Sequence, residues 1–465
     1  MELSAQKLNK VFILSFLTML FLVACNSAAT NEGELSVANE PITEANEETK
    51  PETAVSEEES PPEPTPTNPL PTNTPLPDSI IEEVDETADN EEIEMEEVGQ
   101  LTLEDGTIVF TTDDRATGLK SLTSSWNTNW NRRTIATDEI LSGGPPRDGI
   151  PSIDDPKFIS QEEATEWLAG NEPVVAVEFN GDARAYPLQI LTWHEIVNDT
   201  VGDIPVIVTF CPLCNSAIVF DRTLDGEPVE FGTSGLLRNS DLIMYDRMTE
   251  SLWQQFTGEA IIGDAVGTKL TFLPSSLISF DDFRAAYPEG TILSRDTGIA
   301  RDYGRNPYAG YDEIGNNPFL FRGDLDERLA AVERVVTISL DNGTDIAYPL
   351  SILSEMGAIN DTQGEIDLVV FHLPGTSSAL GASVIADAED VGATGVFSRL
   401  VDGQTLTFSR DGETFVDAAT GSTWNIVGHA VDGELAGTQL EPIIHGDHFW
   451  FSWAAFKPDT IIYQQ

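Results

Sequence analysis

An internal duplication constrains this chain more than any other feature of its sequence. The segment Ala185-Tyr186-Pro187-Leu188 recurs as Ala347-Tyr348-Pro349-Leu350, and Asn198-Asp199-Thr200 returns at the same spacing as Asn360-Asp361-Thr362. Trp253 and Trp424 continue the same order of landmarks further along the chain. We therefore predict two related domains, the first over residues 173–294 and the second over residues 335–465.

Each copy has the pattern of short strands joined by tight turns. Apolar or alternating runs are separated by Asp-Gly, Asn-Gly or Gly-Asp pairs, which favour hairpins. A short helix is expected after each Tyr-Pro-Leu segment, and a second, aromatic helix near the end of each copy. Alternation in Leu242–Tyr245 and Thr405–Phe408 indicates antiparallel sheets with one buried face. We predict an α+β fold that is mainly antiparallel β with short helices, and the sequence leaves barrel and sandwich as open alternatives.

The N-terminus is typical of an exported protein. Lys7 and Lys10 precede an apolar run from Val11 to Val23, which is too short to span a bilayer and fits the core of a signal peptide. The following Leu22-Val23-Ala24-Cys25 resembles the lipobox of bacterial lipoproteins, in which the cysteine is diacylated, with palmitate for example, and becomes the first mature residue. We expect residues 1–24 to be removed and Cys25 to anchor the chain to the extracytoplasmic side of the cell membrane. An ordinary secretory signal or an uncleaved anchor is the alternative.

Composition assigns roles to the segments outside the repeats. Residues 25–100 are acidic and rich in proline, with almost no aromatic side chains, so we expect a disordered tether. The formal net charge of −55 repels nucleic acid, which we exclude as a partner. Residues 101–172 are predicted to be a lead-in segment that packs on the first repeat. Residues 295–334 form an aromatic loop between the repeats, interpreted as an inter-domain strap or, less favoured, as a cover over a site in the first repeat.

A pair of cysteines marks the candidate site. Cys211 and Cys214 follow the apolar run Val206–Phe210, which predicts a buried strand that holds them at its end. With Cys25 assigned to lipid, they are the two cysteines left for chemistry. Two thiols at this spacing can share a metal ion, form a disulfide, or cycle between the two states.

Comparison of the two copies separates the site from the scaffold. His194, Glu195 and Cys211 stand where the second copy has Met356, Gly357 and His372, so they are the better candidates for chemistry. Positions that both copies keep, such as the Asn-Asp pair, are attributed to turns and core. Five further polar residues are expected around the site because they lack partners in the second copy: Arg238, Asp246, Arg247, Gln254 and Gln255.

The motifs of the first repeat resemble those of a prokaryotic family. Arg147–Pro151, Trp193–Asp199, Cys211–Cys214 and Tyr245–Arg247 are similar to the motifs of domain of unknown function 3179, and the resemblance covers roughly Gly143 to Tyr463. It implies an exported bacterial or archaeal protein, often a lipoprotein, with Cys-Pro-Leu-Cys as its signature and with no established activity. Asn215 departs from the glycine that the resemblance leads us to expect after the second cysteine, which weakens the argument for a metal-binding turn.

Three interpretations of the cysteine pair follow. The favoured one is a copper or zinc site with Cys211, Cys214 and His194 as ligands, and with Glu195 or Asp199 as a fourth ligand or a supporting group. Thiol–disulfide exchange is the second, although the residues after Cys214 alternate like a strand and do not begin a helix. A structural disulfide within a surface ligand- or protein-binding module is the third. Hydrolase, phosphate-loop and dinucleotide motifs are absent from the sequence, so an enzyme is not supported.

Overall fold

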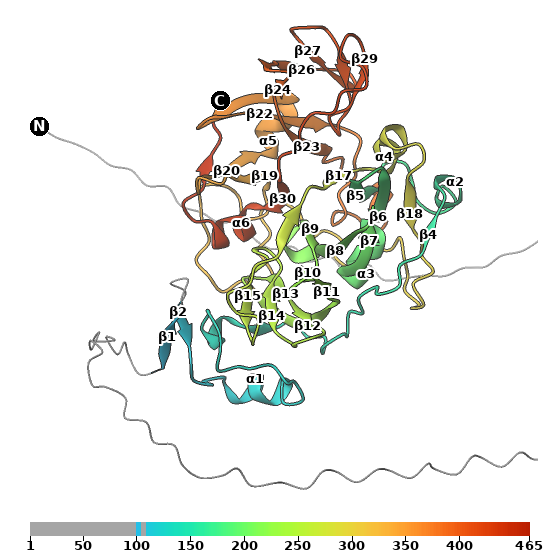
Figure 1. Cartoon of the computed structure of the whole chain (residues 1–465). Coiled ribbons are helices and arrows are strands. Elements are labelled where there is room, and N and C mark those ends of the chain that lie inside the picture. Colours follow the sequence, from blue (N-terminus) through green and yellow to red (C-terminus); the bar gives the residue numbers. More distant parts are fainter. Residues whose placement is uncertain (1–98, 104–107) are drawn as a thin grey trace, which may run out of the picture. The chain divides into compact units, whose positions relative to one another are not determined.

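The computed structural model describes residues 99–103 and 108–465, which belong to one compact unit (Figure 1). The predicted signal peptide, Cys25 and nearly all of the predicted tether lie outside the described residues. Within those ranges, none of the helices combines the length and the apolar character that a membrane crossing requires.

The segment before the first repeat contributes strands to the sheets of that repeat. Its β3 pairs with β12, and its β4 pairs antiparallel with β18. The helix α2 begins with a capping box, because the Ser160 hydroxyl accepts from the amide of Glu163 and the Glu163 carboxylate accepts from the amide of Ser160. The elements of this segment are β1 (Gln100–Thr102), β2 (Ile108–Phe110), α1 (Thr117–Leu122), η1 (Thr137–Glu139), β3 (Leu141–Ser142), β4 (Phe158–Ile159) and α2 (Gln161–Ala164).

The first repeat forms three small sheets with strand orders β17-β5-β6-β18-β4, β16-β9-β8-β7 and β15-β14-β13-β12-β3, and β10 pairs with β11. Most neighbours are antiparallel, and β6 and β18 are a parallel pair. The elements are β5 (Pro173–Phe179), β6 (Asp182–Pro187), α3 (Leu188–His194), β7 (Ile196–Val201), β8 (Ile204–Cys211), η2 (Pro212–Cys214), β9 (Ser216–Asp221), β10 (Thr223–Leu224), β11 (Glu227–Pro228), β12 (Phe231–Arg238), β13 (Asp241–Asp246), β14 (Leu252–Gln254), β15 (Ala260–Ile262), β16 (Thr271–Leu273), β17 (Ser276–Ser279), α4 (Phe280–Ala286) and β18 (Thr291–Leu293).

The second repeat reproduces this arrangement. Its sheets run β30-β19-β20-β31, β21-β22-β23 and β26-β27-β28-β29, and β20 and β31 are again the parallel pair. The elements are β19 (Arg334–Ser339), β20 (Asp345–Pro349), α5 (Leu350–Met356), β21 (Ala358–Gln363), β22 (Ile366–Leu373), η3 (Ile385–Asp387), β23 (Ala393–Ser398), β24 (Leu400–Val401), β25 (Gln404–Thr405), β26 (Phe408–Asp411), β27 (Thr414–Asp417), β28 (Thr423–Trp424), β29 (Ala430–Asp432), β30 (Gly446–Phe449), α6 (Trp450–Phe456) and β31 (Ile461–Ile462).

The matching strand orders confirm the duplication and the predicted α+β, mainly antiparallel fold. The helices expected after each Tyr-Pro-Leu segment are α3 and α5, and the aromatic helices near the end of each copy are α4 and α6. In the part of the chain that the structure describes, every sheet is open and none closes into a barrel. The sheets are therefore open and packed on one another, which agrees with the sandwich alternative and excludes the barrel for these residues.

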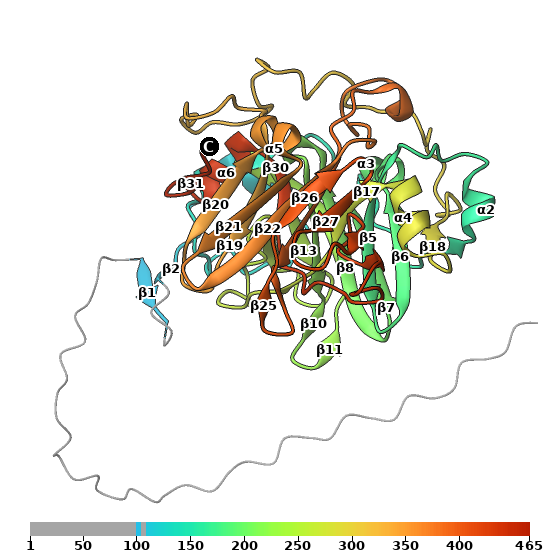
Figure 2. The same cartoon turned by 90° about the horizontal axis from the view of Figure 1, so that it is seen from above.

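The two copies pack on each other through shared apolar cores. Strand β17 lies beside β23, and β9 lies beside β30, so one copy covers an edge of the other (Figures 1 and 2). Phe449 and Phe451 of the second copy are buried in the core that contains Cys211 and Cys214. This burial of aromatic area makes the second copy a support for the site in the first.

The segment between the repeats has features of both predicted roles. It bridges the copies, because Gly310 donates its amide to the Leu380 carbonyl at 2.9 Å and Asn306 donates its side-chain amide to the Ala382 carbonyl at 3.0 Å. It also reaches the first repeat, where the Ser240 hydroxyl donates to the Phe319 carbonyl at 2.6 Å. The strap therefore contacts the chain just before strand β13 begins at Asp241.

Candidate metal centre and adjoining cavity

The two cysteines lie where a buried strand turns back on itself. Strand β8 ends at Cys211, the single turn η2 contains Cys214, and β9 begins at Ser216 and pairs with β8. Both residues are free cysteines, and their exposed fractions are 2% and 0%. The local fold thus delivers two thiols side by side into a site that is closed to solvent.

The backbone conformation at Asn215 explains why asparagine can replace the expected glycine without disrupting this turn. Its φ is 50°, in the left-handed region where asparagine is among the best tolerated of the residues that carry a side chain. The turn therefore needs a residue that tolerates the left-handed conformation, and asparagine tolerates it, as glycine does. Its side-chain amide also donates to the Asp447 carbonyl of the second copy at 3.4 Å.

Asp241 completes a cluster of three donor groups with Cys211 and Cys214. One carboxylate oxygen and the two sulfur atoms all lie within 4.8 Å of one another. Asp241 begins strand β13 after a hairpin turn at Asn239 and Ser240, both of which have positive φ. Its Oδ2 accepts from Gln254 Nε2 at 2.6 Å and from the Phe256 amide at 3.0 Å, whereas its Oδ1 is buried without a hydrogen-bond partner among the described residues.

Burial makes the charged forms of all three donors costly. Loss of solvent raises the pKa of Asp241 to about 7, although hydrogen bonds from Gln254 and Phe256 lower it in part. Burial also raises the pKa of Cys211 and raises that of Cys214 well above its usual range. No salt bridge within the described residues compensates Asp241. Without a bound cation the cluster therefore holds protons near neutral pH.

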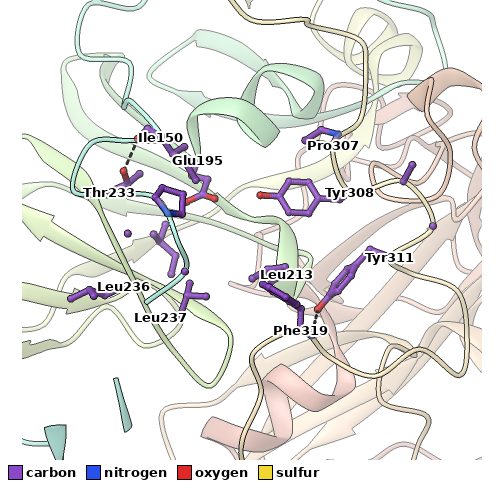
Figure 3. Close-up of a pocket in the computed structure, with 16 residues that line it drawn as sticks. Ile150, Glu195, Leu213, Thr233, Leu236, Leu237, Pro307, Tyr308, Tyr311 and Phe319 are labelled. Atoms are coloured by element: carbon purple, nitrogen blue, oxygen red, sulfur yellow. Dashed lines mark hydrogen bonds between the residues drawn. The ribbon is translucent and has the colours of Figure 1, made fainter. Parts of the chain in front are cut away.

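Glu195 lies next to the cluster and at the edge of a cavity. It ends helix α3 in the left-handed conformation, with φ of 58°, and is 8% exposed. Burial, with a smaller contribution from the charge of Asp241, raises its pKa to about 8. Its carboxyl group makes no hydrogen bond within the described part of the chain and lines a cavity of about 420 Å³ (Figure 3).

The cavity lies between the first repeat and the strap. The Leu213 side chain, between the two cysteines, forms part of its wall, so the buried thiols lie directly behind the lining. Tyr308, Tyr311 and Phe319 of the strap also line the cavity, and Figure 3 shows Tyr308 across from Glu195. The strap thus covers the site, which was the less favoured of the two interpretations drawn from the sequence.

His194 lies outside the cluster of three donor groups, and its role as a metal ligand stays a prediction. Its Nδ1 lies 2.7 Å from the Pro151 carbonyl, and its Nε2 lies 2.6 Å from the Tyr303 hydroxyl. Because the carbonyl only accepts, Nδ1 donates to it, and Nε2 then accepts from Tyr303 in the neutral ring. Burial lowers the pKa of His194, which favours that neutral form. Both nitrogens therefore serve structural hydrogen bonds.

The residues expected around the site divide into one that contacts the cluster and several that do not. Gln254 donates to Asp241, as described above. Arg238 pairs with Glu139 at 2.7 Å, and Arg247 pairs with Asp148 and Asp154 at 3.3 and 3.2 Å. Asp199 binds Arg184 at 2.7 Å and accepts from the Tyr186 hydroxyl at 2.5 Å, which fixes β6 against β7. These three residues stabilise the scaffold.

Asp246 also belongs to the scaffold, because it has a counterpart that the sequence comparison missed. It accepts from Trp253 Nε1 at 2.9 Å, and in the second copy Asp417 accepts from Trp424 Nε1 at 3.1 Å. The expectation that Asp246 lacks a partner is wrong. Aspartate and tryptophan are seven residues apart in both copies, so aligning the repeats on this pair would have revealed the equivalence.

The same alignment would have revealed Asp241. When Asp246 is placed on Asp417, Asp241 falls on Gly412, so it is an acidic residue that the second copy lacks. It was hidden because aspartate is abundant in this acidic chain and because the position lies in a hairpin turn, where aspartate is common for conformational reasons.

The fold and the site together define a duplicated, mainly antiparallel protein with a buried dithiol–carboxylate cluster in its first copy. A family described as protein of unknown function (DUF3179) matches residues 147–460, which is more than half of the chain, so the protein belongs to that family. No curated protein and no solved structure matches the chain.

Proposed function

We propose that this chain is a metal-binding protein that holds a thiophilic ion through Cys211, Cys214 and Asp241. The observation that carries the proposal is the mutual approach of the three donor atoms within 4.8 Å in a fully buried site. Asp241 Oδ1 adds to it, because a buried carboxylate oxygen without a partner is costly unless a proton or cation satisfies it. A bound ion would replace the protons and neutralise the buried charges.

The donor set favours zinc over copper. Two thiolates suit both metals, but a carboxylate oxygen is a harder ligand than the imidazole expected from the sequence, and it is a common third ligand of zinc. Gln254 would orient that carboxylate through its hydrogen bond to Oδ2. Glu195 lies outside this set of three donors and lines the cavity.

Burial argues against thiol–disulfide exchange. Exchange requires an accessible thiolate, whereas both thiols are closed to solvent and the pKa of each is raised. The role as a membrane-anchored protein is part of the proposal and rests on the lipobox at Cys25. Metal handling, or redox chemistry that depends on a bound metal, at the extracytoplasmic surface is the function that these features support best.

The test is elemental analysis of the full chain purified under reducing conditions. We expect close to one ion per chain, with zinc preferred to copper in competition. Cys211→Ser, Cys214→Ser and Asp241→Asn should each abolish stoichiometric binding. Cobalt(II) added to the metal-free protein should produce a sulfur-to-metal charge-transfer band that the two serine variants lack.

Two matched controls isolate the cluster. Cys25→Ser removes the third thiol of the chain and should leave the metal content unchanged. Asp411→Asn changes an exposed aspartate in the corresponding hairpin of the second copy and should also have no effect. Absence of metal from protein whose Cys211 and Cys214 titrate as free thiols would refute the proposal, as would full metal content in the Asp241→Asn variant.

A further inference from the structure

The cavity beside the cluster has walls whose polar groups are nearly all satisfied by the protein. The Thr233 hydroxyl donates to the Ile150 carbonyl at 2.5 Å, and the Tyr311 hydroxyl accepts from the Phe319 amide at 3.2 Å (Figure 3). Most of the remaining lining is apolar, with several leucines among it. The walls therefore offer shape and apolar surface, and they leave few groups for recognition.

Two side-chain polar groups of the lining lack protein partners. The Glu195 carboxyl and the Tyr308 hydroxyl make no hydrogen bond within the described residues. Figure 3 shows them on opposite sides, both pointing into the space between them. Glu195 is more than nine-tenths buried, so its carboxyl group has its free space on the side of the cavity.

We propose that the cavity binds a small, largely apolar molecule with one hydroxyl group, either an alcohol or a phenol. A hydroxyl donates one hydrogen bond and accepts another, so it can donate to the Glu195 carboxyl and accept from Tyr308. An ammonium head only donates, so it leaves the Tyr308 O–H without an acceptor. A carboxylate head is costly to desolvate, and no basic side chain among the lining residues compensates its charge.

The size and charge of the protein agree with such a ligand. The volume of about 420 Å³ lies within the range of small-molecule sites. The formal net charge of −55 disfavours anionic ligands at long range. The inference goes beyond the metal proposal and does not depend on it, since Glu195 and Tyr308 both lie outside the three-donor cluster.

The experiment is calorimetric titration of the full chain with three probes of equal chain length, hexan-1-ol, hexylamine and hexanoate. Hexan-1-ol should bind most tightly, and hexanoate should bind at least about 10-fold more weakly, because no basic side chain of the lining compensates its charge. Glu195→Met and Tyr308→Phe should each weaken the binding of hexan-1-ol by about 3- to 10-fold through the loss of one hydrogen bond.

A third variant keeps the test valid if either of these folds poorly. Ala309 is an exposed residue of the strap that lines the cavity, so Ala309→Trp fills the space without disturbing the core and should abolish binding. Glu166→Gln and Tyr463→Phe change residues that do not line the cavity and should bind hexan-1-ol as the wild type does.

The outcomes separate this inference from the metal proposal. Cys211→Ser should lose metal and still bind hexan-1-ol, whereas Ala309→Trp should keep metal and lose the probe. Equal binding of hexanoate and hexan-1-ol, undiminished binding by Ala309→Trp, or no binding of any probe by the wild type would overturn the inference.

Discussion

Replacement of Asp241 by asparagine should stabilise the metal-free protein at high pH and not at low pH. The folded state raises the pKa of Asp241 from 3.8 to about 7, so the native carboxyl keeps its proton over a range in which the unfolded one has lost it. The favourable contribution is complete below pH 3.8 and is lost as the pH rises through about 7. Asparagine does not titrate, and it retains an oxygen that can accept from Gln254 and Phe256.

The size of the effect follows from the shift. A rise from 3.8 to about 7 corresponds to about 4 kcal/mol at 1.36 kcal/mol per pKa unit. With an unfolding entropy of about 2.1 cal/mol/K per residue, a unit of roughly 360 residues converts this energy into about 5 °C. The difference between the melting temperatures of Asp241→Asn and wild type should therefore grow by about 5 °C between pH 4 and pH 8.

The assay is thermal unfolding of reduced protein in the presence of a chelator across this pH range. Using the difference between the two proteins removes the contribution of the many other carboxyl groups, which both share. Asp411→Asn, which changes an exposed aspartate in the equivalent hairpin, is the matched control. Parallel profiles for Asp241→Asn and wild type would refute the reasoning. With zinc at about 100 times its Kd the difference at high pH should narrow by more than half, because binding stabilises the wild type by about 2.7 kcal/mol.

Three further predictions concern other residues. Cys25→Ala should move the protein from the membrane to the soluble fraction, and unchanged partitioning would contradict the lipid anchor. His194→Ala should keep its metal on elemental analysis while losing about 1–3 kcal/mol of unfolding free energy, because Pro151 and Tyr303 lose their partner; loss of the ion would restore His194 as a ligand. Asp246→Ala and Asp417→Ala should each cost a similar 1–3 kcal/mol or so in denaturant titrations, since each leaves a buried indole N–H unpaired, and a large difference would argue against their equivalence.

Much of the fold was predictable because the sequence presents its pattern twice. Turn pairs and alternating apolar residues determine local strands, and the second copy tests every assignment made in the first. Helices α3 and α5 begin directly after Pro187 and Pro349, where the fixed φ of proline suits a helix start. The packing of the copies on each other was not predictable, because it depends on which apolar faces remain uncovered after each copy folds.

The site was predicted only where its residues are close in sequence. Cys211 and Cys214 are three positions apart at the end of one strand, so their proximity follows from local geometry. His194 and Glu195 are adjacent, yet one faces Pro151 and Tyr303 while the other faces the cavity, and this divergence is set by the helix end between them. Asp241 belongs to a different sheet from the two cysteines. Its proximity to them depends on how the sheets pack, which composition and spacing do not reveal.

The backbone at Glu195 supports a role in recognition and argues against one in folding. In the second copy the equivalent helix ends at Gly357 with φ of 71°, where glycine adopts the left-handed conformation without strain. A methyl group built there would meet the Arg410 side chain at 2.8 Å, so the second copy has closed the space beside it. The first copy holds a glutamate at φ of 58°, at a cost of about 1 kcal/mol or more, and leaves its carboxyl unpaired at an open cavity. If this position served only the fold, glycine would be the less strained residue here, as it is in the second copy. The strained backbone and the unpaired carboxyl therefore coincide at the cavity for which we propose a ligand.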